Sequence, residues 1–321
     1  MKKHSNIPIF IPHLGCKNDC VFCNQRSITG QLSETTISEV HDTTEKYLSF
    51  LKDRDADIAF FGGSFTGLPA EKQTEYLKAA YYYLEKGMVS GIRLSTRPDY
   101  ISDEILKNLK KYGVTSIELG VQSMCDDVLA ASKRGHRAEV TEKACEKIKK
   151  SGFSLGLQMM VGLPLDNREK SLFTAQRLID MGAEFVRIYP TCVLYDTALY
   201  NMYTQGLYTP LDITEAVEIS YELTKLFKKN NVAVIRTGLQ STDTLSESVA
   251  AGPYHPAFGE LVASRLLRDE LEEYILNSSS DGEIVFYCPQ NMISKYIGQK
   301  RCNAEYLEKK YNIRLRIAPL K

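Results

Sequence analysis

Three cysteines lie close together near the start of the chain. Cys16, Cys20 and Cys23 follow an apolar run in the stretch IPIFIPHLGCKNDCVFC, and no fourth cysteine lies nearby. A structural zinc site and an ordinary 4Fe–4S cluster both use four protein ligands, so three thiolates leave one metal position open. The spacing therefore favours a 4Fe–4S cluster whose fourth iron chelates a substrate or cofactor. The alternative is a structural zinc completed by His13, although His13 is expected to lie on the preceding strand.

The composition is that of an ordinary globular protein. The chain has 321 residues, with 40 Lys and Arg against 40 Asp and Glu, so the formal net charge is zero. A balanced charge gives no global basic field for nucleic acid or for an acidic membrane surface. The first residues have no apolar signal-peptide core, and no apolar run is long enough for a membrane span. Eight cysteines in such a chain favour a cytoplasmic protein with metal-bound thiolates over a disulfide framework.

Short apolar runs alternate with amphipathic segments over the first 190 or so residues. The expected strands are 7–13, 57–65, 91–99, 114–123, 153–164 and 183–191, and the expected helices are 32–54, 70–87, 101–113, 138–152 and 168–181. Continuous apolar strands are typical of a parallel sheet that is covered by helices. Six βα units are too few to close a standard eight-fold barrel. The fold class predicted is therefore α/β, with a partial, laterally open (β/α)6 barrel and a small α+β C-terminal extension.

Two domains are expected, the barrel over 1–195 and the extension over 196–321. A helix over 213–229 and a strand over 232–240 are expected to extend the barrel sheet, and the tail reads β-α-α-β. The tail segment ISKYIGQKR resembles the loop by which KH domains hold a nucleic-acid backbone, but Arg301 stands where that loop has its second glycine. A small capping subdomain is the favoured interpretation.

Several motifs besides the cysteines fall at successive expected strand ends. They read FGGSF, STRPD, GVQS, KRGH and MMVGLP, and Phe22 places an aromatic residue directly before the last cysteine. Together with the Cx₃Cx₂C spacing they resemble the radical S-adenosylmethionine (SAM) superfamily, nearest the radical-SAM domain of the Elongator catalytic subunit and its short bacterial relatives. The resemblance implies a 4Fe–4S cluster and SAM as cofactors, reductive cleavage of SAM, and an electron donor such as flavodoxin or ferredoxin.

The resemblance also implies roles for individual residues. Cys16, Cys20 and Cys23 match the cluster ligands. Nine residues match SAM-binding positions: Phe22 and Met160 for the adenine, Gly62, Gly63 and Ser64 for the methionyl amine, Ser95 and Gln158 for the ribose, and Gln122 and Arg134 for the methionyl carboxylate.

The residue types suit these roles. Glycines let backbone carbonyls approach an ammonium group closely, and arginine offers the planar fork that a carboxylate needs. Ser95 and Gln158 depart from the relatives, which often carry an acidic residue at the ribose positions.

Substrate contacts are expected from the late strands and their loops. Tyr189, Asp196, Arg236 and His255 are the candidates. Relatives tend to carry glycine where this chain has Asp196, and a carboxylate there would suit the N1–H and exocyclic amine of a guanine-like base. The competing interpretations are a solvated loop carboxylate for Asp196, a packed side chain for Tyr189 and a structural role for His255.

The function expected is hydrogen abstraction from a small-molecule, nucleobase-type substrate. Overall likeness to the short relatives suggests a queuine lyase, a C–N lyase that cuts the cyclopentenediol from queuine and leaves the aminomethyl 7-deazaguanine base in queuosine salvage. A tRNA-modifying radical SAM enzyme is one alternative, with tRNA as its partner. A zinc-stabilised RNA-binding module is an alternative of another class. No acetyltransferase domain is expected in a chain of this length, and no membrane partner.

Overall fold

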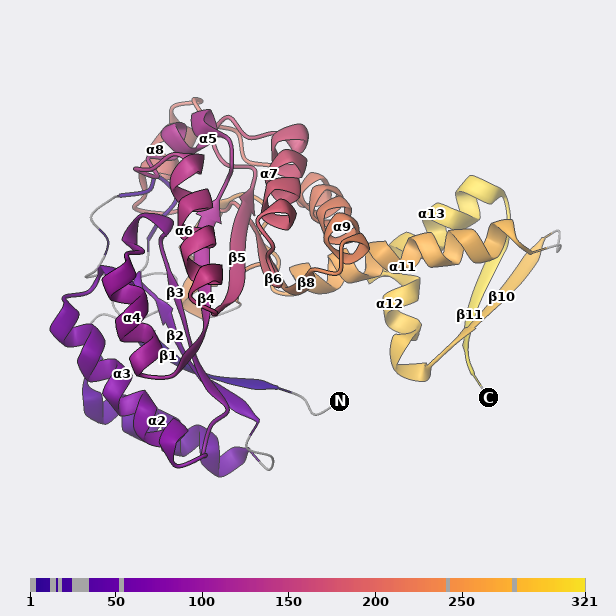
Figure 1. Ribbon diagram of the computed structural model, residues 1–321. Coiled ribbons are helices and arrows are strands. Elements are labelled where there is room, and N and C mark those ends of the chain that lie inside the picture. Colours follow the sequence, from indigo (N-terminus) through magenta and orange to yellow (C-terminus); the bar gives the residue numbers. More distant parts are fainter. Residues whose placement is uncertain are drawn as a thin grey trace.

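The barrel is built on one curved parallel sheet of seven strands (Figure 1). The computed structural model describes residues 4–11, 16, 19–24, 35–51, 55–240, 243–278 and 282–320. The strand order is β1-β2-β3-β4-β5-β6-β8, and every neighbouring pair is parallel. The strands are β1 (Ser5–Ile11), β2 (Ala56–Gly62), β3 (Gly91–Thr96), β4 (Val114–Gln122), β5 (Ser154–Val161), β6 (Phe185–Pro190) and β8 (Ala233–Thr237). The expected partial barrel is confirmed, and its sheet continues past residue 195 through β8, as predicted.

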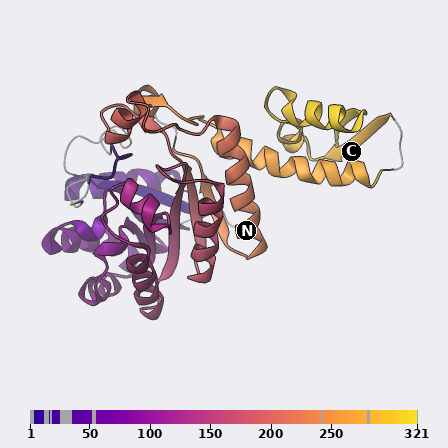
Figure 2. The same cartoon turned by 90° about the horizontal axis from the view of Figure 1, so that it is seen from above.

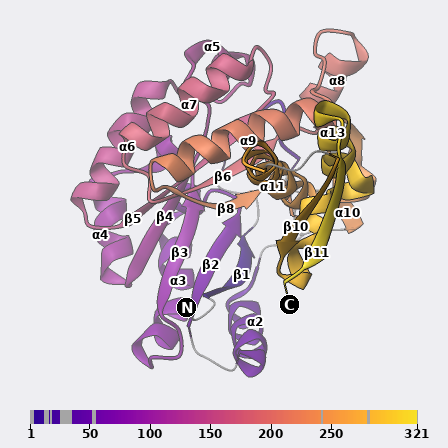
Figure 3. The ribbon, with the colours of Figure 1, turned by 90° about the vertical axis from the view of Figure 1, so that its right-hand side faces the viewer.

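Helices cover the outer face of this sheet (Figure 3). They are α2 (Ile37–Phe50), α3 (Ala70–Glu85), α4 (Asp103–Lys111), α6 (Ala138–Lys150), α7 (Arg168–Asp180) and α9 (Ile213–Lys229). The outward side chains of the strands, such as Ile7, Ile58 and Leu157, join one large apolar core with these helices. The inward side chains are different in kind, because β4 presents Glu118 and Gln122 and β6 presents Arg187 to the concave face. The sheet therefore separates an apolar layer from a polar interior.

The expected helices and strands agree with the structure to within a few residues where both are described. Helix α2 begins at Ile37 because Thr36 caps it, accepting from the backbone N–H of Glu39 while the Glu39 carboxylate accepts from Thr36. Residues 32–34 and 52–54 of the expected helix lie outside the described part. Helix α4 stops at the predicted glycine, since Gly113 has a φ of +69°.

Helix α11 (Phe258–Leu276) was not predicted from the sequence. Its apolar residues do not share one face along its length. Phe258 and Val262 near its start pack with α9 residues, whereas Leu271 and Ile275 near its end pack in a separate small core. The helix changes partner halfway, so the periodic pattern that identifies an amphipathic helix is blurred. Short elements were also missed, among them α5 (Asp126–Ala131), α8 (Ala198–Thr204), and β7 (Val193–Leu194), which pairs antiparallel with β9 (Val249–Ala251).

The C-terminal part projects from the barrel at the end of α11 (Figure 2). It has the predicted β-α-α-β order: β10 (Glu283–Cys288), α12 (Ile293–Ile297), α13 (Cys302–Tyr311) and β11 (Arg314–Pro319), with β10 and β11 parallel. In the turn before α13, Gly298, Lys300 and Arg301 all have positive φ, and Arg301 pairs with Glu308 at 3.4 Å. Among the described residues, no helix combines the length and apolar character that a membrane crossing needs.

Gly156 on β5 packs closely against Phe185 on β6, and this contact can be tested by substitution. A Cβ atom at this position would lie 2.1 Å from the ring of Phe185 on the neighbouring strand. Overpacking of this kind costs about 1–3 kcal/mol. We expect Gly156→Ala to lower the free energy of unfolding by that amount in urea titrations. Phe185→Leu should relieve the clash, so the double variant should be less destabilised than the two single changes added together. Additive losses would contradict this packing.

Candidate active site

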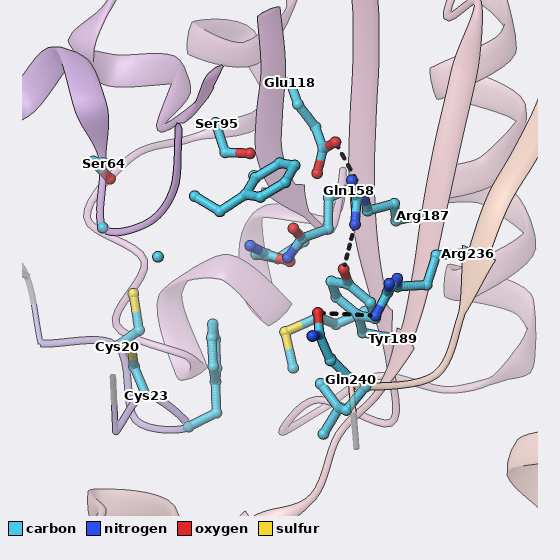
Figure 4. A pocket seen from close by; sticks show the side chains of 18 of the residues that line it. Cys20, Cys23, Ser64, Ser95, Glu118, Gln158, Arg187, Tyr189, Arg236 and Gln240 are labelled. Carbon is cyan, nitrogen blue, oxygen red and sulfur yellow. Dashed lines mark hydrogen bonds and ion pairs between the residues drawn. The ribbon is translucent and has the colours of Figure 1, made fainter. Parts of the chain in front are cut away.

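A cavity of about 450 Å³ opens on the concave face of the sheet (Figure 4). The three cysteines and all nine expected SAM-binding residues line it, together with Tyr189 and Arg236. The members of this set are Cys16, Cys20, Cys23, Phe22, Gly62, Gly63, Ser64, Ser95, Gln122, Arg134, Gln158 and Met160. The structure therefore brings together fourteen of the sixteen sequence-predicted residues, and Asp196 and His255 are the two that it leaves outside.

Parallel strands explain why residues so far apart in sequence meet here. The carboxyl ends of parallel strands lie along one edge of the sheet, which is where open α/β sheets bind ligands. Gly62 ends β2, Gln122 ends β4 and Tyr189 lies next to the end of β6. Both Gly62 and Gln122 have positive φ, +95° and +71°, and the register of β4 against β5 shifts between Gly120 and Gln122. A left-handed glutamine is a strained conformation of the kind that clusters at functional sites.

The cysteine loop lies against two buried arginines. Cys20 is 7% exposed, and its Sγ receives hydrogen bonds from Arg97 Nη1 at 3.6 Å and from Arg134 Nη1 at 3.4 Å. Cys16 Sγ lies 3.1 Å from Ser64 Oγ, which links the loop to the end of β2. Two guanidinium groups around one sulfur favour negative charge at that point, as thiolates bound to a cluster would supply.

Arg134 is a buried arginine that has no carboxylate partner among the described residues. It is 6% exposed, and its hydrogen bonds go to Cys20 Sγ and to the Gly120 carbonyl. Its Nε is buried without a partner, and no carboxylate pairs with it in the described parts of the chain. By contrast, Arg97 has a bidentate partner in Asp99. A buried unpaired guanidinium is costly, so the site fits a ligand that carries a carboxylate.

Other polar groups also point to a polar ligand. Ser95 Oγ is buried with no hydrogen-bond partner among the described residues. Gln158 Nε2 donates to Gln122 Oε1 at 3.3 Å, which joins a residue expected at the ribose to one expected at the carboxylate. On the apolar side, Phe22, Met160 and Tyr189 pack in one small cluster, as a wall for an adenine would require.

The cysteines do not converge on one point. In the described part of the chain, no three His, Cys, Asp or Glu side chains are close enough together to hold a single metal ion. A 4Fe–4S cluster does not require this, since each cysteine binds a different iron. His13, the proposed fourth ligand of the zinc alternative, lies outside the described residues.

Sequence reasoning missed a polar group in the interior of the barrel. Glu118 Oε2 accepts a hydrogen bond from Arg187 Nε at 2.9 Å, and Arg187 Nη1 donates to Tyr189 Oη at 3.3 Å. Burial raises the pKa of the Tyr189 hydroxyl, so it stays protonated at neutral pH. Nearer the mouth, Arg236 Nη1 donates to Gln240 Oε1 at 3.5 Å. Strand alternation could have revealed Glu118, because it shares a face of VTSIELGVQ with Gln122.

Asp196 does not reach the cavity. Its side chain is exposed in the turn between β7 and α8, and its φ is +59°. Glycine adopts this left-handed conformation most easily and aspartate tolerates it, so the turn itself explains the residue type at position 196 without a substrate role. The solvated-carboxylate interpretation of Asp196 therefore fits the structure better than a substrate contact.

His255 also lies away from the cavity. Its Nδ1 accepts from the backbone N–H of Ala257 at 3.1 Å, at the start of α11, and its Nε2 is 3.3 Å from Gln299 Nε2 in the C-terminal part. These contacts fit the structural role that was the alternative for His255.

Comparison with known proteins agrees with this geometry. The model of the radical SAM superfamily matches residues 10–178, and that of the Radical_SAM C-terminal domain matches 183–268. A tRNA uridine(34) acetyltransferase of Methanocaldococcus infernus is 33% identical over 175 residues, 53% of this chain and 32% of the relative. Human Elongator complex protein 3 is 30% identical over 184 residues, 50% of this chain and 34% of the relative. The chain thus spans about a third of the length of these relatives.

A further relative matches over most of its length. It is an uncharacterized protein of Methanocaldococcus jannaschii, 30% identical over 78% of this chain and 80% of its own. Among solved structures, archaeal M. infernus Elp3 with an N-terminal deletion superposes with a TM-score of 0.66 at 22% identity, covering 87% of this chain and 66% of that one. The family uses a 4Fe–4S cluster and SAM. Because its model spans more than half of the 321 residues, this chain belongs to the radical SAM superfamily.

Proposed function

We propose that this chain holds a 4Fe–4S cluster on Cys16, Cys20 and Cys23 with SAM beside it, and removes a hydrogen atom from a nucleobase-type substrate in the same cavity. The observation that carries the proposal is Arg134: a buried guanidinium with no carboxylate partner in the described chain, 3.4 Å from the Cys20 sulfur. One end of such a guanidinium can face the cluster while the other receives the methionyl carboxylate.

The remaining residues have roles that follow from their chemistry. When bound, the cluster and SAM supply a 5′-deoxyadenosyl radical as the hydrogen-abstracting group. Gln122 and Arg134 would orient the methionyl carboxylate, and the Gly62–Ser64 turn would receive the amine. Ser95, with its unpaired buried hydroxyl, would bind the ribose together with Gln158. Phe22 and Met160 would pack on the adenine and exclude water from it.

A base carried by tRNA is the first candidate substrate. It is supported by the relatives, whose names describe tRNA uridine(34) acetyltransferases, and by the likeness in fold to archaeal Elp3. A tRNA-modifying enzyme would act on a base at the open side of the barrel.

A free base is the second candidate, with queuine as the specific compound and C–N bond cleavage as the reaction. Two observations favour it. The cavity, at about 450 Å³, is of the size that small-molecule sites have. The formal net charge of zero gives no broad electrostatic attraction for a polyanion such as tRNA.

The cluster assignment is tested by removing one ligand. Cys20→Ala should abolish both the iron and sulfide content of anaerobically reconstituted protein and its reductive cleavage of SAM to 5′-deoxyadenosine. Cys302→Ala is the matched control, since Cys302 is an exposed thiol in the C-terminal part. Cys125→Ala should likewise keep its iron. Full cluster content in Cys20→Ala would refute the ligand set.

The SAM assignment is tested at Arg134. Loss of a buried charged contact costs on the order of 2–5 kcal/mol, so Arg134→Ala should weaken SAM binding severely. Equilibrium dialysis of the iron-loaded protein measures this directly. Arg137→Ala, which changes an exposed arginine three residues further on, should bind SAM normally. Equal SAM affinity in the two variants would remove Arg134 from the site.

The substrate proposal is tested by stimulation. Reconstituted protein is incubated anaerobically with SAM and reductant, and 5′-deoxyadenosine is measured alone, with bulk tRNA and with queuine. Stimulation by tRNA supports the first candidate, and stimulation by queuine with release of the aminomethyl 7-deazaguanine base supports the second. No stimulation by either tRNA or free bases would overturn the proposal of a nucleobase-type substrate.

A further inference from the structure

Glu118 is a buried carboxylate in the wall of the cavity. It lies on β4 four residues before Gln122 on the same face, so it sits about 13 Å deeper along the strand than the cavity edge. The residue is 4% exposed and still lines the cavity. It pairs in register with Ser95, so it lies in the barrel interior at the inner end of the residues expected to bind SAM, where a substrate would meet the cofactor.

The carboxylate is held in place from one side only. Arg187 Nε donates to Glu118 Oε2 at 2.9 Å, and the Arg187 guanidinium lies 5.1 Å over the Phe61 ring. Within the part of the chain that the structure describes, no side chain donates to the other oxygen, Oε1. In Figure 4 the pair lies side by side with the Tyr189 hydroxyl next to it. The ion pair with Arg187 offsets part of the cost of burying this side chain.

We propose that Glu118 is the group by which this enzyme recognises its substrate, and that the substrate base has a guanine-like edge rather than a uracil-like one. This inference rests on the proposed function, a nucleobase-type substrate in this cavity. A carboxylate accepts hydrogen bonds and donates none. A guanine-like base offers adjacent N–H donors from its ring nitrogen and its exocyclic amine.

Uracil presents the opposite pattern to the same wall. In uridine N1 carries the ribose, so the one remaining ring N–H, at N3, lies between two carbonyl oxygens. At least one oxygen would then face the Glu118 carboxylate. The carbonyl oxygen and the carboxylate oxygen would then face each other with no hydrogen atom between them. Two unpaired acceptors are unfavourable in a buried site. The names of the relatives refer to uridine, so the carboxylate marks a difference in base preference from what those names describe.

Arg236 offers hydrogen-bond donors for the carbonyl oxygen of a guanine-like base. The carbonyl of a guanine-like base lies next to its ring N–H, and arginine is the common partner of guanine oxygen and nitrogen acceptors. Arg236 lines the same cavity, and its single side-chain hydrogen bond among the described residues is the 3.5 Å contact to Gln240. A carboxylate and a nearby guanidinium with donors to spare are complementary to such an edge.

The experiment compares two bases that differ in one group. 7-Deazaguanine and 7-deazahypoxanthine are identical except that the second lacks the exocyclic amine. The third probe is 1-methyluracil, in which N1 is blocked as it is in uridine. Binding is measured anaerobically on iron-loaded, SAM-bound protein by isothermal titration calorimetry. Wild-type protein should bind 7-deazaguanine at least tenfold more tightly than either other base, because one unpaired buried group changes affinity on the order of tenfold to a hundredfold.

Glu118→Gln gives the sharpest variant, because it keeps the shape and replaces one oxygen with an amide that donates. If the amide oxygen faces Arg187, the NH₂ group faces the base donors, and the preference for 7-deazaguanine should be lost. Glu118→Asp keeps the charge and should restore part of the preference. Glu222→Gln is the matched control, since Glu222 pairs with Arg168 on the surface.

The outcomes separate this inference from the proposed function. Equal binding of the two deazapurines, tighter binding of 1-methyluracil, no binding of 7-deazaguanine by wild type, or an unchanged preference in Glu118→Gln would each overturn the role of Glu118. If 5′-deoxyadenosine formation is nevertheless stimulated by tRNA or by a base, the proposed function survives. Iron content and SAM affinity of each variant show whether it has folded, and the wild-type comparison decides the case even if Glu118→Gln does not fold.

Discussion

The active site depends on two buried guanidinium groups that donate hydrogen bonds to the same sulfur atom. Arg97 and Arg134 both donate to Cys20 Sγ, from the turns that follow β3 and α5. Burying two like charges side by side is unfavourable unless negative charge lies between them or beyond them. Asp99 balances Arg97, and no carboxylate in the described chain balances Arg134. The apoprotein thus carries a positive site that an anionic cluster and a carboxylate ligand complete.

The curvature of the sheet lets one layer serve two purposes. Its outer face contributes isoleucine, leucine and valine to the core with the surrounding helices, which supplies the hydrophobic stabilisation. Its inner face is then free to carry Ser95, Glu118, Gln158 and Arg187, whose burial would be costly without partners. At the carboxyl edge the backbone turns away, and its glycines allow close approach of a ligand. Deeper along the strands, alternation decides which side chains point inward.

The cluster-ligand and SAM-binding residues expected from the sequence all line the cavity, whereas two of the four expected substrate contacts do not, for physical reasons. A Cx₃Cx₂C loop and glycines at a strand end are local patterns that seldom arise without a cluster or a ligand to bind. Glu118 is different: one acidic residue within an otherwise apolar strand shows its importance only when Arg187 is seen beside it. Asp196 shows the reverse error, because a charge that replaces glycine seemed to mark a pocket, whereas its φ of +59° shows a requirement of the turn. Helix α11 was missed because it buries one face against the barrel and another against the C-terminal part.

Similarity to the relatives is therefore a better guide at the strand ends of the cavity than at its interior wall. At the strand ends the backbone conformation itself is constrained, since Gly62 and Gln122 are both left-handed. The interior wall has no such constraint, since replacing one inward side chain changes the hydrogen-bond pattern offered to a base and leaves the sheet intact. A carboxylate held by an arginine at that wall accepts hydrogen bonds from a ligand and repels carbonyl oxygens. On the proposal made for Glu118, the choice of base follows from the side chain at position 118 and is independent of the residues at the strand ends.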